Sequence, residues 1–364
     1  GYFVSRGWSS PSGKLCIFPR EAGIAPLDGN HEGDYPGVKN LNPIYPPKGQ
    51  PEEKDAALPY HDLDSMIEYS QQSGRDFYRL ALEYETWCLG LKYSDEIAGL
   101  IFLEAKKMLN SLDRSSRPFG DIDFDSNTPE TSNVIKTYMN LREAYNNVNA
   151  EFLGNSFYDA VSGAITAMTR NAFSELILAA PTGGACGILP GVFLALKNMK
   201  VKTGEISEED FEDKAARSLL VCGLFAALTA NIVPPSGAEK GCQAETGTAA
   251  GMGAAFATYF LDGTREQIVN AMILAIKNSL GLVCDPIAGK VNTPCIKRNA
   301  FKAIEALLGA WLSLNGIVSF VSPNQVIKAM AQIGDDMADR YRETSEGGLA
   351  KTIDGLKERM CKFG

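Results

Sequence analysis

Apolar residues recur at helical spacing from residue 63 onward, and charged residues fall on the opposite faces. A polar stretch marked by Pro and Gly, residues 111–128, is expected to be a loop. No series of alternating apolar and polar residues indicates strands, so the sequence predicts an all-α body. The predicted helices are residues 63–90, 95–112, 131–148, 155–179, 209–232, 243–261, 264–279, 299–317 and 323–334, with one more after a Gly-rich turn near residue 187.

The first 60 residues differ in composition from the rest of the chain, because they hold nine of the eighteen prolines and many glycines. Such a composition continues neither a helix nor a central strand. We predict an extended N-terminal segment at 1–60 that wraps a neighbouring surface or docks a partner, with a poorly ordered tail as the alternative. The catalytic domain is then expected at 61–350 and a C-terminal tail at 351–364.

Bulk properties exclude several classes of protein. A net charge of −9 and a pI near 5.0 argue against nucleic-acid binding. The longest apolar run, Leu219–Leu228, is shorter than a membrane span and predicts a buried core helix. The first residues lack the apolar core of a signal peptide, so we expect a cytoplasmic protein whose eight cysteines are thiols or metal ligands rather than disulfides.

Three cysteines lie beside Gly, Pro and Asp in segments that resemble turns between helices: Cys242, Cys284 and Cys295. Thiolates are soft ligands that suit iron, and three of them leave one iron of a cluster open to a substrate oxygen. A structural zinc site is the alternative, but tight C-x₂₋₄-C pairs are absent. Of the other thiols, Cys16 is interpreted as a packed residue, Cys88 as a core or interface residue and Cys222 as a core residue, whereas Cys186, in the Gly-rich turn, is a less favoured ligand.

The Gly-rich turn of residues 179–191 precedes an apolar helix. Backbone N–H groups at a helix N-terminus favour an anion such as a substrate carboxylate, although Gly-rich turns are common.

Five segments are similar to the α-chain of iron–sulfur L-serine dehydratases, and the similarity covers about residues 155–350. They are Ala180–Gly187, Ser236–Glu245, Asn278–Gly289, Pro294–Ala300 and Gly347–Ala350. The resemblance implies an all-α catalytic domain, a [4Fe–4S] cluster on Cys242, Cys284 and Cys295, and no pyridoxal phosphate. It implies substrate binding by the Pro181–Gly184 and Ser236–Gly237 turns. The predicted substrate-binding residues are Asn171, Thr182, Gly183, Gly184, Ser236, Gly237, Arg298 and Asn299.

Members of that family usually carry a second, α/β domain, fused or as a separate β chain, and no such domain is apparent here. A β-type subunit or a homodimer is therefore a candidate partner. Cys361 is a candidate for a resting-state ligand of the open iron, with a packed or exposed thiol as the alternative. An ion pair with a neighbouring acid is the alternative role for Arg298.

The implied chemistry removes the β-hydroxyl of serine and the Cα proton, and the resulting enamine hydrolyses to pyruvate and ammonia. The base is not identified; Ser236, Lys240, Glu239 and His61 are candidates, and His61 is alternatively a surface residue beside a helix start. Release of sulfide from L-cysteine and dehydration of L-threonine would use the same machinery. A non-catalytic subunit or sensor that carries a cluster is the alternative of another class.

Overall fold

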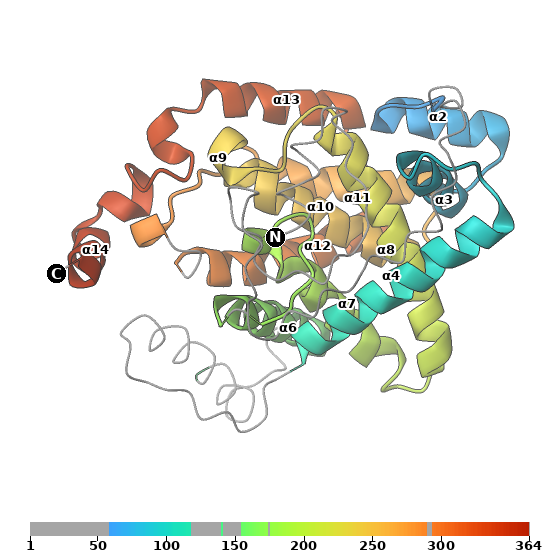
Figure 1. Ribbon diagram of the computed structural model, residues 1–364, viewed down its shortest axis with the longest axis horizontal. Helices are drawn as coiled ribbons and strands as arrows, with labels where there is room; N and C mark the ends of the chain where they lie inside the picture. The colour runs from blue at the N-terminus through green and yellow to red at the C-terminus, as the bar shows by residue number, and fades with distance from the viewer. Residues whose placement is uncertain (1–57, 118–139, 141–153, 174, 290–292, 364) are drawn as a thin grey trace.

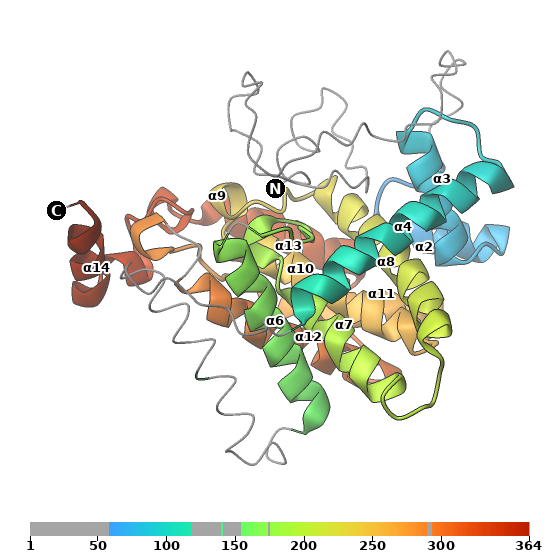
Figure 2. The same ribbon diagram turned by 60° about the horizontal axis from the view of Figure 1, so that its bottom comes forward.

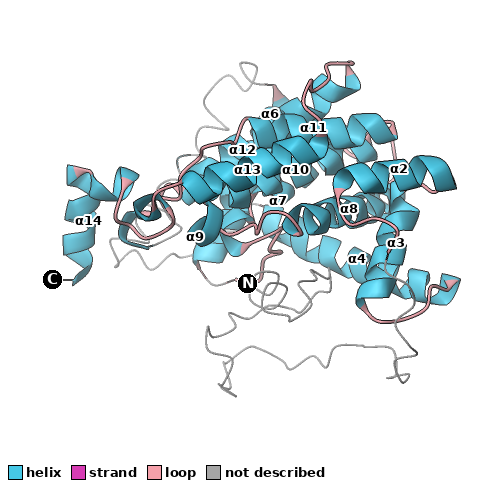
Figure 3. Ribbon diagram, turned by 90° about the horizontal axis from the view of Figure 1, so that it is seen from above, coloured by secondary structure: helices cyan, strands magenta, loops and turns pink. Residues whose placement is uncertain are grey.

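The computed structural model describes residues 58–117, 140, 154–173, 175–289 and 293–363. Within these residues the regular structure is helical and contains no strand, which confirms the all-α prediction (Figure 3). The longer helices are α2 (Leu63–Ser73), α3 (Phe77–Cys88), α4 (Asp95–Ser116), α6 (Asn155–Ala172), α7 (Ile188–Lys200), α8 (Glu208–Ala230), α10 (Cys242–Phe260), α11 (Arg265–Lys277), α12 (Cys295–Leu314), α13 (Pro323–Asp336) and α14 (Ile353–Phe363). Short helical turns are η2 (Gly183–Ala185), α9 (Gly237–Lys240), η3 (Ile287–Gly289), η4 (Asp339–Tyr341) and η5 (Gly348–Lys351).

Helix α10 is the centre of the bundle and packs against α7, α8, α11 and α12 (Figure 1). Nearly all of its residues are buried, as expected of a helix that is apolar on every side. Its many Gly and Ala residues let neighbouring helices approach closely; Gly253, for example, lies against Ala306 of α12. The first residue of this central helix is Cys242.

The two ends of the molecule are formed by different parts of the chain. Helices α2 and α3 lie at one end and α14 lies at the other, beyond the bundle (Figures 1 and 2). The outer face of α14 exposes Ile353 and Met360. None of the described helices combines the length and hydropathy that crossing a membrane would need.

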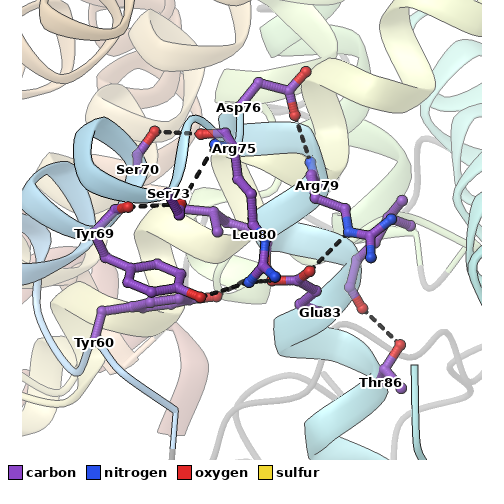
Figure 4. A network of polar contacts seen from close by, with 11 residues as sticks. Tyr60, Tyr69, Ser70, Ser73, Arg75, Asp76, Arg79, Leu80, Glu83 and Thr86 are labelled. Carbon is purple, nitrogen blue, oxygen red and sulfur yellow. Dashed lines mark hydrogen bonds and ion pairs between the residues drawn. The ribbon is translucent and has the colours of Figure 1, made fainter. Parts of the chain in front are cut away.

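The predicted helix 63–90 is two helices, because the chain turns at Gly74. Gly74 adopts a left-handed conformation (φ 71°) that ends α2, and the Asp76 side chain caps α3 by accepting from the Arg79 N–H at 2.7 Å. The turn is held by hydrogen bonds from Ser70 Oγ to the Arg75 carbonyl and from Tyr60 OH to the Leu80 carbonyl (Figure 4). Periodicity alone missed this break, since the apolar positions continue through it.

Three other boundaries differ from prediction. Helix α6 ends at Ala172 rather than at residue 179, and the N–H of its C-cap residue Phe173 donates to carbonyls of the last turn. Helix α4 runs through Ser116 into the predicted loop 111–128, because Leu112 is fully buried in the core. The predicted tail 351–364 contains α14. The predictions for 1–57 and for most of 131–148 lie outside the described residues.

A buried polar cluster joins the end of α11 to α12. Lys302 Nζ donates to Glu305 Oε2 at 2.7 Å and to Ser279 Oγ at 2.7 Å, and Ser279 Oγ donates to Glu305 Oε1 at 3.0 Å. The Lys302 side chain is 8% exposed and that of Glu305 is 21% exposed. The cluster therefore fixes the turn that leads to Cys284 against the helix that begins at Cys295.

Replacing Lys302 with Met is expected to lower the free energy of unfolding by about 1–3 kcal/mol, because it leaves a half-buried carboxylate without its cation. Denaturant unfolding monitored by circular dichroism measures this change. The double variant Lys302→Met/Glu305→Leu is expected to recover most of the loss, because no unpaired charge remains. Equal stability of wild type and single variant would contradict this role of the cluster.

Candidate metal centre

Three buried thiols lie at the ends of different elements. Cys242 begins α10, Cys295 begins α12, and Cys284 lies in the loop after α11. The thiol sulfurs of Cys242 and Cys284 and a carboxylate oxygen of Glu245 lie within 4.8 Å of one another. The positive ends of the α10 and α12 dipoles lie at Cys242 and Cys295, a position that favours negative charge on a metal-bound thiolate.

The loop that carries Cys284 is anchored on both sides. The Cys284 N–H donates to the Tyr341 carbonyl at 2.8 Å, and the Glu343 N–H donates to the Cys284 carbonyl at 2.8 Å, forming an isolated parallel bridge. On the other side, the Gln243 N–H donates to the Leu282 carbonyl at 2.9 Å. The position of Cys284 is therefore tied to the start of α10 and to the segment after α13.

The pKa values of the three thiols are shifted in different directions. The pKa of Cys242 is lowered, first by a hydrogen bond from the Cys284 thiol and then, against the effect of burial, by the Arg298 guanidinium. The pKa of Cys284 is raised by the same hydrogen bond and by burial. The pKa of Cys295 is raised by burial and by the charges of Cys242 and Glu245. One thiolate is thus stabilised before any metal is bound.

Arg298 is the cation of this site and is fixed by backbone and side-chain partners. Its Nη1 donates to the Val283 carbonyl at 3.0 Å and its Nη2 to Asp285 Oδ1 at 3.2 Å. Asp285 Oδ2 in turn accepts from the Leu349 N–H at 2.8 Å. Burial is the largest effect and lowers the pKa of Arg298, but the charges and hydrogen bonds of Cys242 and Asp285 together outweigh it, so the pKa is raised overall. The ion pair with a neighbouring acid, foreseen from the sequence as an alternative, is present.

Glu245 is a site residue that the sequence reasoning did not single out. Thr182 Oγ1 donates to its Oε1 at 2.5 Å. Burial, followed by the charge of Cys242, raises its pKa to about 8. A signal existed in the sequence, since Glu245 is the only charged residue of α10. A lone acid in an apolar helix points to a function for its carboxyl group.

Glu343 is a second unforeseen acid. The residue is exposed, yet neighbouring atoms take its carboxyl partly out of water and, with the Cys242 charge, raise its pKa. Its charge also contributes to raising the pKa values of Cys284 and Cys295. The acid therefore lies near the thiols but on a part of the site that is open to solvent.

The Gly-rich turn is held by two asparagines. Asn171 Nδ2 donates to the Gly183 carbonyl at 2.9 Å, and the buried Asn299 donates to the Gly184 carbonyl at 2.8 Å. Asn299 Oδ1 also accepts from the Gly187 N–H at 3.0 Å, so its amide is bonded to backbone on both sides. Among the described residues, the N–H groups of Gly183 and Gly184 have no acceptor. Both remain available to an anion.

The Ser236–Gly237 turn lies against the thiols. A Cβ atom on Gly237 would come within 2.8 Å of the Cys284 sulfur and 3.2 Å of Glu245 Oε2. Among the described residues the Ser236 hydroxyl has no hydrogen-bond partner. The Ser236–Gly237 turn and the turn around Gly184, both predicted to bind substrate, therefore both border Glu245.

The other candidate bases have different surroundings. Lys240 is ion-paired with Asp335 of α13. Glu239 is exposed on α9. His61 precedes α2, where its exposed ring lies 3.3 Å from Asp62 and its carbonyl accepts from Asn231. The structure does not bring His61 to the thiols.

The other described cysteines are Cys88, Cys186 and Cys222. Cys222 is fully buried in the main core, as its sequence context indicated, and Cys186 packs beside Met168 in a second core cluster. Cys88 is partly buried against the main core. Cys16 and the side chain of Cys361 lie outside the described residues.

The donor set fits a thiolate-bound metal centre. Three buried sulfur donors on three elements, with one fixed arginine to offset their charge, suit iron or another soft metal. Glu245, Ser236 and the free N–H groups of the Gly-rich turn place polar groups around the same region. The arrangement has the parts of a site that holds a small anionic molecule beside a metal cluster.

Comparison with known proteins gives concordant results. A family model described as "Serine dehydratase alpha chain" matches residues 107–350. The chain is 41% identical over 222 residues to "Probable L-serine dehydratase, alpha chain" of Bacillus subtilis, covering 61% of this chain and 71% of that protein. It is 41% identical over 206 residues to a protein of the same description from Latilactobacillus sakei, covering 57% and 95%. It is 30% identical over 309 residues to "L-serine dehydratase 1" of Escherichia coli, covering 83% and 64%.

Proposed function

The chain belongs to the serine dehydratase alpha-chain family, and on this premise we propose that it is a lyase that converts L-serine to pyruvate and ammonia. The observation that carries the proposal is the pair of buried thiols, Cys242 and Cys284, within 4.8 Å of a Glu245 carboxylate oxygen, with the buried Cys295 at the start of α12. The Gly-rich turn that borders Glu245 adds two N–H groups that have no acceptor among the described residues. The names of the relatives support serine over other amino acids.

We propose a [4Fe–4S] cluster held by Cys242, Cys284 and Cys295, without pyridoxal phosphate. When bound, the cluster would supply an open iron, a Lewis acid that helps the β-hydroxyl leave. Arg298 offsets the negative charge of the thiolates, and its bonds to Val283 and Asp285 keep it in place. The anchoring of the Cys284 loop fixes the spacing of the ligands.

The free N–H groups of Gly183 and Gly184 are proposed to bind the substrate carboxylate. Asn171 and Asn299 hold the carbonyl groups of this turn, so their part in substrate binding is to orient the turn. Thr182 holds Glu245, which borders the same space. A carboxylate fixed in this way presents Cα and the β-carbon in one orientation to the reacting groups.

The Cα proton must be taken up by a residue of this site. Ser236 adjoins the thiols and has an unpartnered hydroxyl, whereas Lys240 is ion-paired and His61 lies before α2. These contacts favour Ser236 over Lys240 and His61. Loss of the proton and of hydroxide gives an enamine, which tautomerises to an imine and hydrolyses to the 2-keto acid and ammonia.

Turnover with three substrates tests the proposal. Anaerobically purified protein is assayed with L-serine, L-cysteine and L-threonine for 2-keto acid and for sulfide. We expect L-serine to give the highest kcat/KM, with no pyridoxal phosphate released on acid denaturation. Sulfide release from L-cysteine at a higher kcat/KM would identify a desulfidase, and no turnover of any of the three would leave a non-catalytic role.

A partner chain is the second part of the proposal. Two of the relatives are named alpha chains, which supports a β-type subunit for this chain, and a second copy of the chain is the alternative. Mass measurement of the purified protein in solution separates a homodimer from a monomer. Activity of the chain alone would contradict the need for a β-type subunit.

A further inference from the structure

Glu343 lies in the segment that anchors Cys284, between η4 and η5. The residue is exposed, and among the described residues its carboxylate has no hydrogen-bond or ion-pair partner. The charge of Glu343 contributes to raising the pKa values of Cys284 and Cys295, and the charge of Cys242 contributes to raising the pKa of Glu343. Glu346, three residues later, differs, because it is ion-paired with Lys351 and Arg359.

The backbone of Glu343 is strained. Its φ of 62° lies in the left-handed region, which is unfavourable for a residue with a side chain. The conformation is held by the hydrogen bond from the Glu343 N–H to the Cys284 carbonyl at 2.8 Å. Gly would adopt this conformation without strain. The carboxylate of a glutamate at such a position is therefore a candidate functional group.

The other charged groups of the site are already engaged. Glu245 accepts from Thr182 and is enclosed by Gly184 and Gly237. Asp285 is bonded to Arg298 and to the Leu349 N–H, and Arg298 is bonded to the Val283 carbonyl as well. Of the three described acids Glu245, Asp285 and Glu343, the exposed Glu343 is therefore the one whose carboxylate is open to an incoming molecule.

We propose that the Glu343 carboxylate binds the ammonium group of the amino-acid substrate. A zwitterionic substrate whose carboxylate lies on the Gly183–Gly184 turn needs an anionic partner at its other charged group. Glu343 then selects 2-amino acids over hydroxy acids that lack the amino group. This assignment rests on the proposed function, since it concerns the substrate of the same site.

The test measures affinity separately from turnover. Calorimetry on the anaerobic holoprotein gives the dissociation constants of L-serine and of 3-hydroxypropanoate, which lacks the ammonium group. Glu343→Gln is expected to weaken L-serine binding by about 10- to 100-fold, because a hydrogen bond to a charged group is lost. The affinity for 3-hydroxypropanoate and the iron content are expected to stay unchanged.

Two further variants separate binding from structure. Glu343→Gly relieves the strained backbone, so its melting temperature is expected to equal or exceed that of wild type while L-serine affinity falls as in Glu343→Gln. Glu346→Gln, in the same segment, is expected to bind both ligands as wild type does.

Equal weakening of both ligands in Glu343→Gln, unchanged L-serine affinity, or no L-serine binding by wild type would overturn the assignment. L-serine binding without turnover in wild type would contradict the proposed function and leave the Glu343 assignment standing.

Discussion

Cys284→Ala is expected to remove bound iron and to lower the turnover of L-serine by about 100-fold or more, since even outer partners of a metal site contribute 10- to 100-fold. Cys284 lies between the start of α10 and the segment after α13, and its thiol is hydrogen-bonded to Cys242. Its loss leaves two of the three proposed ligands and removes the hydrogen bond that lowers the pKa of Cys242. Iron and acid-labile sulfide analysis, with the keto-acid assay, measures both effects.

Cys222→Ala is the matched control for this prediction. Cys222 is also fully buried, but it lies in the main core, where its thiol donates to the Leu219 carbonyl at 3.2 Å. We expect a small loss of stability and wild-type iron content and turnover. Iron retention by Cys284→Ala at the wild-type level would remove that cysteine from the ligand set.

Gly184→Ala is expected to lower kcat/KM for L-serine by about 100-fold, because displacement of reacting groups by about 1 Å has effects of this size. The new Cβ atom would lie 2.6 Å from Glu245 Oε1 and 3.2 Å from its Cδ. Thr182 holds that carboxyl, and Gly237 closes its other side, so Glu245 has little room to move. The turn itself must then shift, together with the N–H groups proposed to bind the carboxylate.

Gly183→Ala is the control one residue earlier in the same turn. The nearest atom to its added Cβ would be Asn171 Nδ2 at 3.9 Å, an ordinary contact, and both N–H groups remain. Its kcat/KM is expected to stay within about threefold of wild type, as for substitutions that strain nothing. Steady-state kinetics of the two variants measure the difference. Equal losses in both variants would contradict the explanation that residue 184 must be glycine to leave room for the Glu245 carboxyl.

The helical body was predictable because apolar periodicity reports burial directly. Helices α8 and α10–α13 lie close to their predicted ranges. Periodicity fails where local conformation decides, as at Gly74, where a left-handed residue and the Asp76 cap divide one periodic run into two helices. It also fails for α14, whose apolar residues Ile353 and Met360 are exposed and give little sign of a core-facing side.

The thiols of the site were predictable from turn context and from the resemblance, but the acids were not. Glu245 stands out only when α10 is known to be buried on every side. Glu343 is 101 positions away from Cys242 in the sequence, and long-range contacts such as the parallel bridge of Cys284 with Arg342 bring its segment to the thiols. Long-range pairings of this kind leave no local pattern in a single sequence.

Anaerobic purification of the full chain, followed by iron and sulfide analysis and spectra before and after exposure to air, tests the central claim most directly. A [4Fe–4S] cluster predicts about four irons and four sulfides per chain. Air is expected to bleach the spectrum and to abolish keto-acid formation from L-serine. A folded protein without iron, or one whose turnover of L-serine is independent of iron and air, would contradict the assignment of the three thiols.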